Sequence, residues 1–182
     1  SQRAVAVIGP IPPPVHGVTV AIERVLRSHL NARFRMLHVD TSDHRDISTV
    51  GRLDWRNYAL ALRSYFRLIR VCRQERPNLV YVPISQTRIG FLRDSGYLLL
   101  ARLFGKSQTA IHLHGGYFGR FYEACGPLMR WFIDRIMGRV DSAIVLADCF
   151  RPIFRRWLPE DAIHVVPNGT ELSIPGLQVK LE

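Results

Sequence analysis

The sequence predicts an α/β fold, a Rossmann-like doubly wound parallel sheet with helices on both faces. Short apolar runs alternate along the chain with longer segments whose apolar residues recur at three- and four-residue spacing. The apolar runs are nearly continuous, which is typical of strands buried on both faces of a parallel sheet. A length of 182 residues, 47% of them hydrophobic, is enough for one domain with a sizeable core.

Six short runs have the character of buried strands, because they do not alternate apolar and polar residues as half-exposed strands do. We expect these strands over residues 4–8, 34–39, 79–83, 108–113, 142–146 and 162–166. Five segments between them have helical periodicity and few breakers. We expect these helices over residues 17–30, 55–74, 88–104, 120–138 and 148–157. The alternation favours right-handed crossovers and a sheet covered on both faces.

Two stretches are expected to be irregular. Residues 41–54 are polar, have little periodicity and are longer than an ordinary connection between a strand and a helix. The end of the chain has no helical pattern. We therefore assign residues 1–171 to the domain and residues 172–182 to a tail, which is either the start of an interdomain linker or a remnant of cloning.

The chain has no run of about 18 apolar residues, and its first residues lack the features of a signal peptide, so we expect a cytoplasmic protein. Its three cysteines, Cys72, Cys125 and Cys149, are odd in number, far apart and set in helix-like contexts. This pattern favours reduced thiols in the core over disulfides or zinc ligands.

The formal net charge of +10 suits nucleic acid, an anionic membrane surface or a phosphorylated substrate. Among the 25 basic residues only Lys106 and Lys180 are lysine, a skew that a GC-rich genome also produces. The charge alone therefore does not identify the partner.

The stretch GPIPPPVHG, residues 9–17, comes after the first expected strand and lacks the GxGxxG fingerprint of dinucleotide-binding loops. Its prolines have no N–H to offer a phosphate, although they restrict the loop and so aim the glycine at its end. Gly17 leaves room for a ligand at the start of the next helix, where the N–H groups of Val18 and Thr19 face outward. Gly17 is either an anion contact or only a turn glycine.

The stretch HLHGG, residues 112–116, comes after the fourth expected strand. His112 and His114 point to the same face because they are two residues apart in a strand. We expect His112 to be a hydrogen-bonded core residue and His114 to lie at the crevice, where Gly115 and Gly116 let the backbone approach a ligand. The sequence has no third ligand at a suitable spacing, so we expect no metal site.

Ligands of open parallel sheets bind at the carboxyl ends of the strands, so the residues there are candidates for binding. They are Asp40 after the second expected strand, Ser85 and Gln86 after the third, and Asn168 and Gly169 after the sixth. Asp148, after the fifth, is expected to cap the amino end of the next helix. The chain contains no GxSxG, Walker, HExxH or CxxC motif.

Four motifs in this order carry a family resemblance: GPIPPPVHGVTVA, HLHGG, GRVDSAIVLAD and VVPNGTE. With these separations the chain resembles the N-terminal domain of GT-B glycosyltransferases and is most similar to glycosyltransferase family 4, also called group 1. The likeness extends to about Glu171. Each motif alone has low specificity, but four in order within an alternating βα frame are fairly specific.

The resemblance implies a retaining enzyme that needs no metal or other cofactor and moves a sugar from a nucleotide-sugar to an acceptor. In a bacterium the acceptor would be a cell-surface polysaccharide or a glycolipid. The resemblance assigns Gly17 and Val18 to the donor diphosphate and His114 to the reacting sugar. It assigns Asn168 and Gly169 to an interdomain hinge. By position, the acceptor contacts would be Asp40, Ser85, Gln86, Gly115, Gly116 and Tyr117.

Two features of such enzymes are missing from this chain: a C-terminal domain with basic residues for the donor phosphates, and an acidic motif of two Glu residues. We therefore expect a hexosyltransferase-type activity only in a longer protein and none in this chain alone. The alternative is a stand-alone, non-catalytic Rossmann-like module that binds a nucleotide or a phosphorylated ligand. A nucleic-acid partner is not expected, because no recognition helix or comparable element is visible.

A basic stripe runs along the helix expected at residues 55–74. Arg56, Arg63, Arg67 and Arg70 fall on one side of a helical wheel. Tyr58, Tyr65, Leu68, Ile69 and Cys72 fall on the other. The stripe is either an ordinary solvated face or, with the aromatic residues of segments 130–139 and 150–158, a contact with an anionic membrane.

Overall fold

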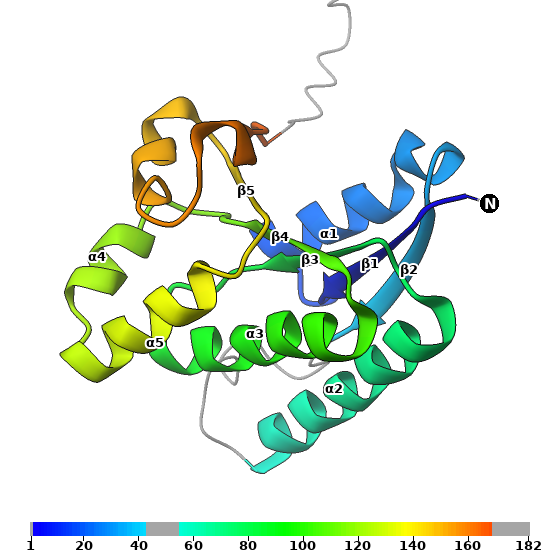
Figure 1. Ribbon diagram of the computed structural model, residues 1–182. Coiled ribbons are helices and arrows are strands. Elements are labelled where there is room, and N and C mark those ends of the chain that lie inside the picture. Colours follow the sequence, from blue (N-terminus) through cyan, green and yellow to red (C-terminus); the bar gives the residue numbers. More distant parts are fainter. Residues whose placement is uncertain (1, 43–54, 169–182) are drawn as a thin grey trace, which may run out of the picture.

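The computed structural model describes residues 2–42 and 55–168 and forms a six-stranded, entirely parallel sheet with the order β2-β1-β3-β4-β5-β6 (Figure 1). The strands are β1 (Ala4–Gly9), β2 (Arg35–Asp40), β3 (Leu79–Pro83), β4 (Gln108–His112), β5 (Ser142–Val145) and β6 (Ile163–Val165). The predicted parallel, Rossmann-like sheet is confirmed. Segments 43–54 and 169–182 lie outside the described residues, so the predictions for them, Gly169 included, stay predictions.

Helices cover both faces of the sheet. The helix α1 (Gly17–Arg27) packs on one face and is followed by a short 3-10 helix, η1 (His29–Ala32). On the other face α2 (Trp55–Glu75), α3 (Arg88–Leu100) and α5 (Pro127–Met137) lie side by side (Figure 1). A π-helical turn, η3 (Ala101–Gly105), continues α3. The remaining short helices are α4 (Phe118–Glu123), η4 (Asp148–Ile153) and η5 (Glu160–Ala162).

The core is divided by the sheet into two clusters. Alternate side chains of each strand point to opposite faces, so Ile8, Val82 and Ile111 belong to the larger cluster under α2, α3 and α5. The smaller cluster contains Val7, Tyr81 and Ile22, a fully buried residue of α1. The near-continuous apolar strands of the sequence therefore reflect burial on both faces.

The helix expected over residues 120–138 is wrong as a single element, because it is two helices. α4 ends at Glu123, and α5 begins at Pro127 after an extended Gly126. Proline lacks an N–H and disfavours helical backbone in the residue before it, so the Gly-Pro pair starts a new helix.

The helix expected over residues 148–157 is also wrong. The segment forms the 3-10 helix η4, with Pro152 inside it, followed by turns. The capping residue is Ala147, and the Asp148 carboxylate instead accepts a hydrogen bond from Nε of Arg151 at 2.9 Å. Asp148 is therefore not the predicted cap. Proline inside the segment prevents a regular α-helical ladder.

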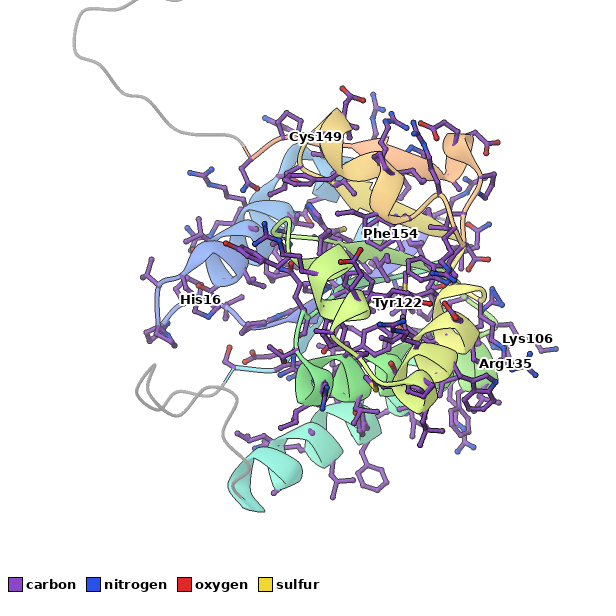
Figure 2. The ribbon with its side chains drawn as sticks, turned by 90° about the vertical axis from the view of Figure 1, so that its left-hand side faces the viewer. His16, Lys106, Tyr122, Arg135, Cys149 and Phe154 are labelled. Atoms are coloured by element: carbon purple, nitrogen blue, oxygen red, sulfur yellow. The ribbon has the colours of Figure 1, made fainter. Side chains whose placement is uncertain are left out.

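The aromatic residues at the end of η4 and beyond it belong mainly to the core. Phe154 is fully buried and packs against Phe118 with ring centroids 5.5 Å apart. The indole N–H of Trp157 donates to Asp134 at 2.8 Å, and Tyr122 also donates to that carboxylate. Figure 2 shows Tyr122 and Phe154 within the body of the domain. The expected contribution of segment 150–158 to a membrane surface is therefore not supported.

Two of the three cysteines confirm the prediction of core thiols. Cys72 and Cys125 are free and buried, whereas Cys149 is free and exposed, so the prediction is wrong for Cys149. Cys149 lies at the start of η4. Across the described ranges, no helix is long and apolar enough to cross a membrane.

The register of the strands aligns three of them at the carboxyl edge. Val7 pairs with Tyr81, and Pro83 pairs with His112. Gly9 therefore ends β1 at the same level as Pro83 on β3 and His112 on β4. Two strand spacings, roughly 10 Å, separate Gly9 from His112. Figure 2 shows His16, beyond the carboxyl end of β1, on the opposite side of the molecule from Lys106, which precedes β4.

Candidate functional site

The candidate site lies at the carboxyl edge of the sheet, where the strand order reverses. The chain leaves β1 toward β2 on one side, and β3 lies on the other side of β1. The connections after β1 and β3 therefore diverge, and the crevice in which ligands of an open α/β sheet usually bind is expected between them. The loops after β1, β3 and β4 border this crevice.

Gly9 sets the packing at the start of the first loop. A Cβ atom on Gly9 would lie 2.7 Å and 2.8 Å from Cγ1 and Cδ1 of the buried Ile22. The carbonyl of Gly9 bonds to Nε2 of His38 on the neighbouring strand at 2.9 Å. Gly9 is therefore needed for the close approach of α1 to β1, independently of any ligand.

The proline loop is held in place by the end of β2. The Ile11 N–H donates to the hydroxyl of Ser42 at 2.9 Å, and that hydroxyl donates to Oδ1 of Asp40 at 2.5 Å. The Ser42 N–H also donates to Asp40 at 2.8 Å. Residues 12–14 form bends, with cis peptide bonds between Pro12 and Pro13 and between Pro13 and Pro14. The predicted crevice residue Asp40 thus positions the first loop.

The amino end of α1 is formed as the sequence indicates. His16 is the capping residue, and its N–H donates to the hydroxyl of the fully buried Thr19 at 3.0 Å. The first helical hydrogen bond runs from Val20 to His16, so the amides of Gly17 and Val18 have no acceptor within the helix. Gly17 is exposed, and a Cβ atom there would meet nothing within 4 Å. The protein itself does not require glycine at this position.

The two histidines at the end of β4 and just beyond it form a stacked pair. The rings of His112 and His114 have centroids 3.9 Å apart and an interplanar angle of 31°. His112 is 7% exposed, and Tyr81 on the neighbouring strand β3 lies with its hydroxyl 2.5 Å from Nδ1 of His112. The prediction of a hydrogen-bonded core histidine at His112 is therefore confirmed, and His114 lies half-buried just beyond it.

Tyr81 also approaches the second histidine. Its hydroxyl oxygen lies 3.4 Å from Nε2 of His114. Burial raises the pKa of Tyr81 far above its ordinary value, so the hydroxyl keeps its proton at neutral pH. When that proton is donated to Nδ1 of His112, the same oxygen can accept from an Nε2–H of His114. This arrangement leaves Nδ1 of His114 as an acceptor.

Both imidazoles are neutral at neutral pH. Burial, helped by the neighbouring His114, lowers the pKa of His112 to about 3, and burial lowers the pKa of His114 to about 4. Among the described residues, none bonds to Nε2 of His112, which is buried. The pair therefore offers hydrogen-bonding imidazoles rather than cations.

The loop after β4 is clamped by a residue from the loop after β3. The side-chain oxygen of Gln86 accepts a hydrogen bond from the N–H of Tyr117 at 2.6 Å. A Cβ atom on Gly115 would lie 2.7 Å from Nε2 of Gln86, and one on Gly116 would lie 2.6 Å from the ring of Phe150. The two glycines thus admit Gln86 and Phe150 against the loop backbone.

The predicted acceptor residues differ in what they leave accessible. The ring of Tyr117 is 66% exposed, with the guanidinium of Arg120 5.7 Å from its centroid. The hydroxyl of Ser85 accepts from Arg93 at 3.2 Å, and its N–H donates to the buried Asp94 at 2.8 Å. Ser85 and Gln86 therefore hold the crevice wall, whereas Tyr117 projects from it. Asn168 is exposed at the end of the described chain, after β6.

Sequence reasoning missed several residues that shape this site. The sequence indicates Tyr81 only as part of an apolar strand, because its contact with the histidines depends on the pairing of β3 with β4. Ser42 had a recognisable signal, because Asp-x-Ser is the pattern of a turn in which the carboxylate accepts from the N–H two residues on. Nothing local indicated that Arg93 and Asp94 would support Ser85.

No group of three His, Cys, Asp or Glu side chains in the described parts of the chain gathers to hold a metal ion. The groups at this edge are two neutral imidazoles, an exposed aromatic ring and the amides of a helix amino end. These groups can bind hydroxyls and an anion.

Comparison with known proteins identifies the family and supports the fold. A family model described as a glycosyl transferase 4-like domain matches residues 15–169. Among solved structures, the chain is similar to the crystal structure of UDP-N-acetylglucosamine 2-epimerase, with a TM-score of 0.53 and 12% identity. That alignment covers 91% of this chain and 48% of the other, so this chain spans about half its length. At this identity the likeness shows the fold alone. The comparison with curated proteins gave no match.

Proposed function

The chain belongs to the glycosyl transferase 4-like domain family, and on this premise we propose that it is the N-terminal, acceptor-side domain of a retaining glycosyltransferase. The enzyme moves a sugar from a nucleotide-sugar to a cell-surface polysaccharide or glycolipid. A second domain, with Asn168 and Gly169 at the hinge, supplies most of the donor contacts. The 182 residues alone therefore carry no transfer.

The observation that carries this proposal is the state and position of His114. It lies half-buried at the crevice, two strands from the end of β1 and stacked on His112. Its low pKa keeps the imidazole neutral at physiological pH, so it is not a general acid there. With Nε2–H directed at Tyr81, Nδ1 accepts a hydrogen bond from a hydroxyl of the reacting sugar.

The diphosphate of the donor lies at the amino end of α1. The amides of Gly17 and Val18 and the positive end of the helix dipole offset its charge. That charge grows as the bond between the anomeric carbon and the diphosphate oxygen breaks and the electron pair stays on the oxygen. The acceptor oxygen forms the new bond to the anomeric carbon, and its proton passes to the diphosphate oxygen that has kept the electron pair. We expect the transfer to need no metal, so EDTA should leave the rate unchanged.

On the acceptor side, the exposed ring of Tyr117 is the residue most available to a sugar, whose apolar C–H face can pack on an aromatic ring. Gly115 and Gly116 keep the backbone beside it open. Ser85, Gln86 and Asp40 act through the loops that they position, as their hydrogen bonds indicate.

The test is the variant His114→Ala in the two-domain protein. We expect transfer to fall by about 100-fold or more, the scale for loss of one positioned polar group at a reacting centre. Circular dichroism checks the fold, and His29→Ala, which removes an exposed histidine of η1, is the matched control. Unchanged turnover would overturn the role of His114. Tight nucleotide binding by the 182-residue chain alone, unaffected by His114→Ala, would instead favour a stand-alone binding module.

A further inference from the structure

The outer side of the helical layer exposes an unusual number of apolar residues. Seven of the eleven large hydrophobic residues that are exposed in the described chain lie on α2, α3, η3 and α5. They are Leu62 (55% exposed), Phe66 (70%), Ile89 (44%), Leu92 (51%), Leu103 (72%), Leu128 (78%) and Trp131 (61%). Single exposed apolar residues are ordinary, but a group on neighbouring elements marks an interaction surface.

These residues form one surface because the helices are neighbours and present corresponding sides. α2 contacts α3, and α3 contacts α5; Figure 1 shows the three side by side. Each helix buries its opposite side against the sheet, for example with Leu68 on α2, Phe91 on α3 and Ile133 on α5. The exposed residues therefore point away from the sheet. We call these seven residues, with the basic residues between them, the outer helical face.

The outer helical face is strongly basic. Residues 59–106 contain nine Arg and Lys residues and two acidic ones, Glu75 and Asp94. Glu75 is paired with Arg35 at 2.6 Å, and Asp94 is buried and paired with Arg93. On α5 the carboxylate of Asp134 is directed to Tyr122 and Trp157. Asp94 thus pairs with Arg93, and Arg102 pairs with Asp141 at 2.9 Å, but in the described parts of the chain no acidic group of these helices pairs with Arg63 or Arg67.

The basic side chains interleave with the apolar ones. On α2, Arg63, Arg67 and Arg70 are exposed beside Phe66, and together they line a shallow groove. In the described parts of the chain, Arg63 and Arg67 make no ion pair. Arg135 is exposed on α5, four residues after Trp131. Apolar side chains among cations are the composition of a surface that lies in a membrane interface.

We propose that the outer helical face binds the surface of an anionic phospholipid membrane. Its arginines contact lipid phosphates, and Phe66, Leu103 and Trp131 enter the boundary between headgroups and acyl chains. The face spans three helices and the π-helical turn, so it is wider than the single basic stripe expected from the sequence. The proposal does not depend on glycosyl transfer, because binding is a property of this chain.

The charge and the apolar residues of the outer helical face argue against two other partners, a second copy of the chain and a nucleic acid. A second copy docked by the same face would bring Arg63, Arg67 and Arg70 against their own counterparts, an unfavourable like-charge contact. A nucleic acid would use the arginines but would leave exposed aliphatic residues such as Leu62 and Leu128 against phosphate and water. An anionic membrane complements both kinds of side chain.

The face also reaches the candidate site. Ile89 lies at the start of α3, three residues after Gln86, which clamps the loop after β4. A membrane on the outer helical face would therefore approach the carboxyl edge of the sheet. An acceptor anchored in lipid could extend from that membrane toward the crevice.

The test is co-sedimentation of the 182-residue chain with vesicles of phosphatidylcholine, with and without phosphatidylglycerol. We expect binding to the anionic vesicles at low salt and a decrease at high salt. The double variant Arg63→Glu and Arg67→Glu should weaken binding by about tenfold or more. The matched control, Arg3→Glu and Arg33→Glu, makes the same charge change at exposed positions away from the outer helical face and should weaken it far less.

The contribution of the apolar residues to membrane binding is measured separately. Phe66→Ser should weaken vesicle binding, whereas Leu30→Ser, at an exposed apolar residue of η1, should not. Anionic vesicles should shift the tryptophan emission to shorter wavelength, and Trp131→Phe should remove most of that shift. Variants that lose binding but keep the circular dichroism and melting temperature of the parent chain support the proposal.

Three results would overturn it. The first is no binding to anionic vesicles at low salt. The second is binding to single-stranded DNA that equals vesicle binding and is insensitive to Phe66→Ser, which would identify a polyanion site. The third is a dimer in analytical ultracentrifugation that the substitutions at Arg63, Arg67 and Phe66 dissociate, which would identify the face as a contact between copies.

Discussion

Replacing Gly17 with alanine should separate ligand binding from folding. A Cβ atom at Gly17 meets no heavy atom within 4 Å, and its φ lies outside the left-handed region. The substitution removes conformational freedom from the unfolded chain, which stabilises by about 0.4–1 kcal/mol where the native backbone accepts alanine. For a domain of this size that corresponds to a rise in melting temperature of roughly 1–4 °C.

Binding of the donor should change in the opposite direction. We propose that the diphosphate lies against the amides of Gly17 and Val18, so the new methyl group occupies the space that the diphosphate needs. We expect a rise in Kd for the nucleotide-sugar of about tenfold or more, or about 1.4 kcal/mol. A gain in stability together with a loss of affinity would show that glycine at position 17 is needed for binding of the ligand and not for folding.

The matched variant is Gly9→Ala, at the other end of the same loop. Its Cβ atom would lie 2.7 Å from Cγ1 of Ile22, which is fully buried and has little room to move. Overpacking of this kind costs about 1–3 kcal/mol, so the melting temperature should fall by roughly 2–12 °C. The same substitution therefore has opposite effects on stability at the two glycines.

Differential scanning fluorimetry measures the two melting temperatures, and isothermal titration calorimetry of the two-domain protein measures the donor Kd. Unchanged affinity in Gly17→Ala would refute the assignment of the diphosphate to the amino end of α1. A drop in its melting temperature as large as that of Gly9→Ala would refute the structural reasoning, since it would mean that the protein itself fills the space at Gly17.

Two further predictions concern the histidine pair and the first loop. The pKa values of His112 and His114, about 3 and about 4, lie below the ordinary value of 6.5. At a pH between these lowered values and 6.5, the two histidines bind more protons in the unfolded chain than in the folded chain. The free energy of unfolding should therefore fall as pH falls through this window, by up to about 2 kcal/mol per histidine between pH 7 and pH 5. Urea titrations at a series of pH values measure this free energy. If the same dependence on pH persists when both histidines are replaced by asparagine, the assignment to His112 and His114 is contradicted. Ser42→Ala leaves the N–H of Ile11 without its acceptor and should destabilise by about 1–3 kcal/mol. The substitution should also weaken donor binding, because the loop after β1 becomes more mobile. An unchanged melting temperature would show that this hydrogen bond does not hold the loop in place.

The sequence determined the elements whose signals are local. Apolar runs and helical periodicity placed all six strands. The observed ends of the strands lie within about one residue of the expected ends. The alternation of strands and helices then favoured a parallel sheet. Two breakers were present in the sequence but were outweighed by periodicity, namely the Gly-Pro pair at Pro127 and Pro152 inside the expected fifth helix. Both are local signals, so the two wrong helices were avoidable without any knowledge of tertiary contacts.

The sequence also selected residues for the candidate site. The rule that ligands bind at the carboxyl ends of parallel strands selected His114, Gly17 and Tyr117 without any contact being known. The same rule did not distinguish residues that face a ligand from residues that hold the loops. Ser85 and Gln86 belong to the second kind by their hydrogen bonds, which join groups separated by several residues or by a whole βα unit.

Only the tertiary structure decided the contacts between residues far apart in the chain. Tyr81 meets His112 because β3 pairs with β4, and Gly9 must be small because α1 returns Ile22 against β1. The outer helical face combines residues from Leu62 to Trp131 that periodicity assigns only to separate helices. Periodicity specifies which side of an element is buried, but which elements become neighbours depends on chain topology and packing. A sequence read locally carries the first kind of information and not the second.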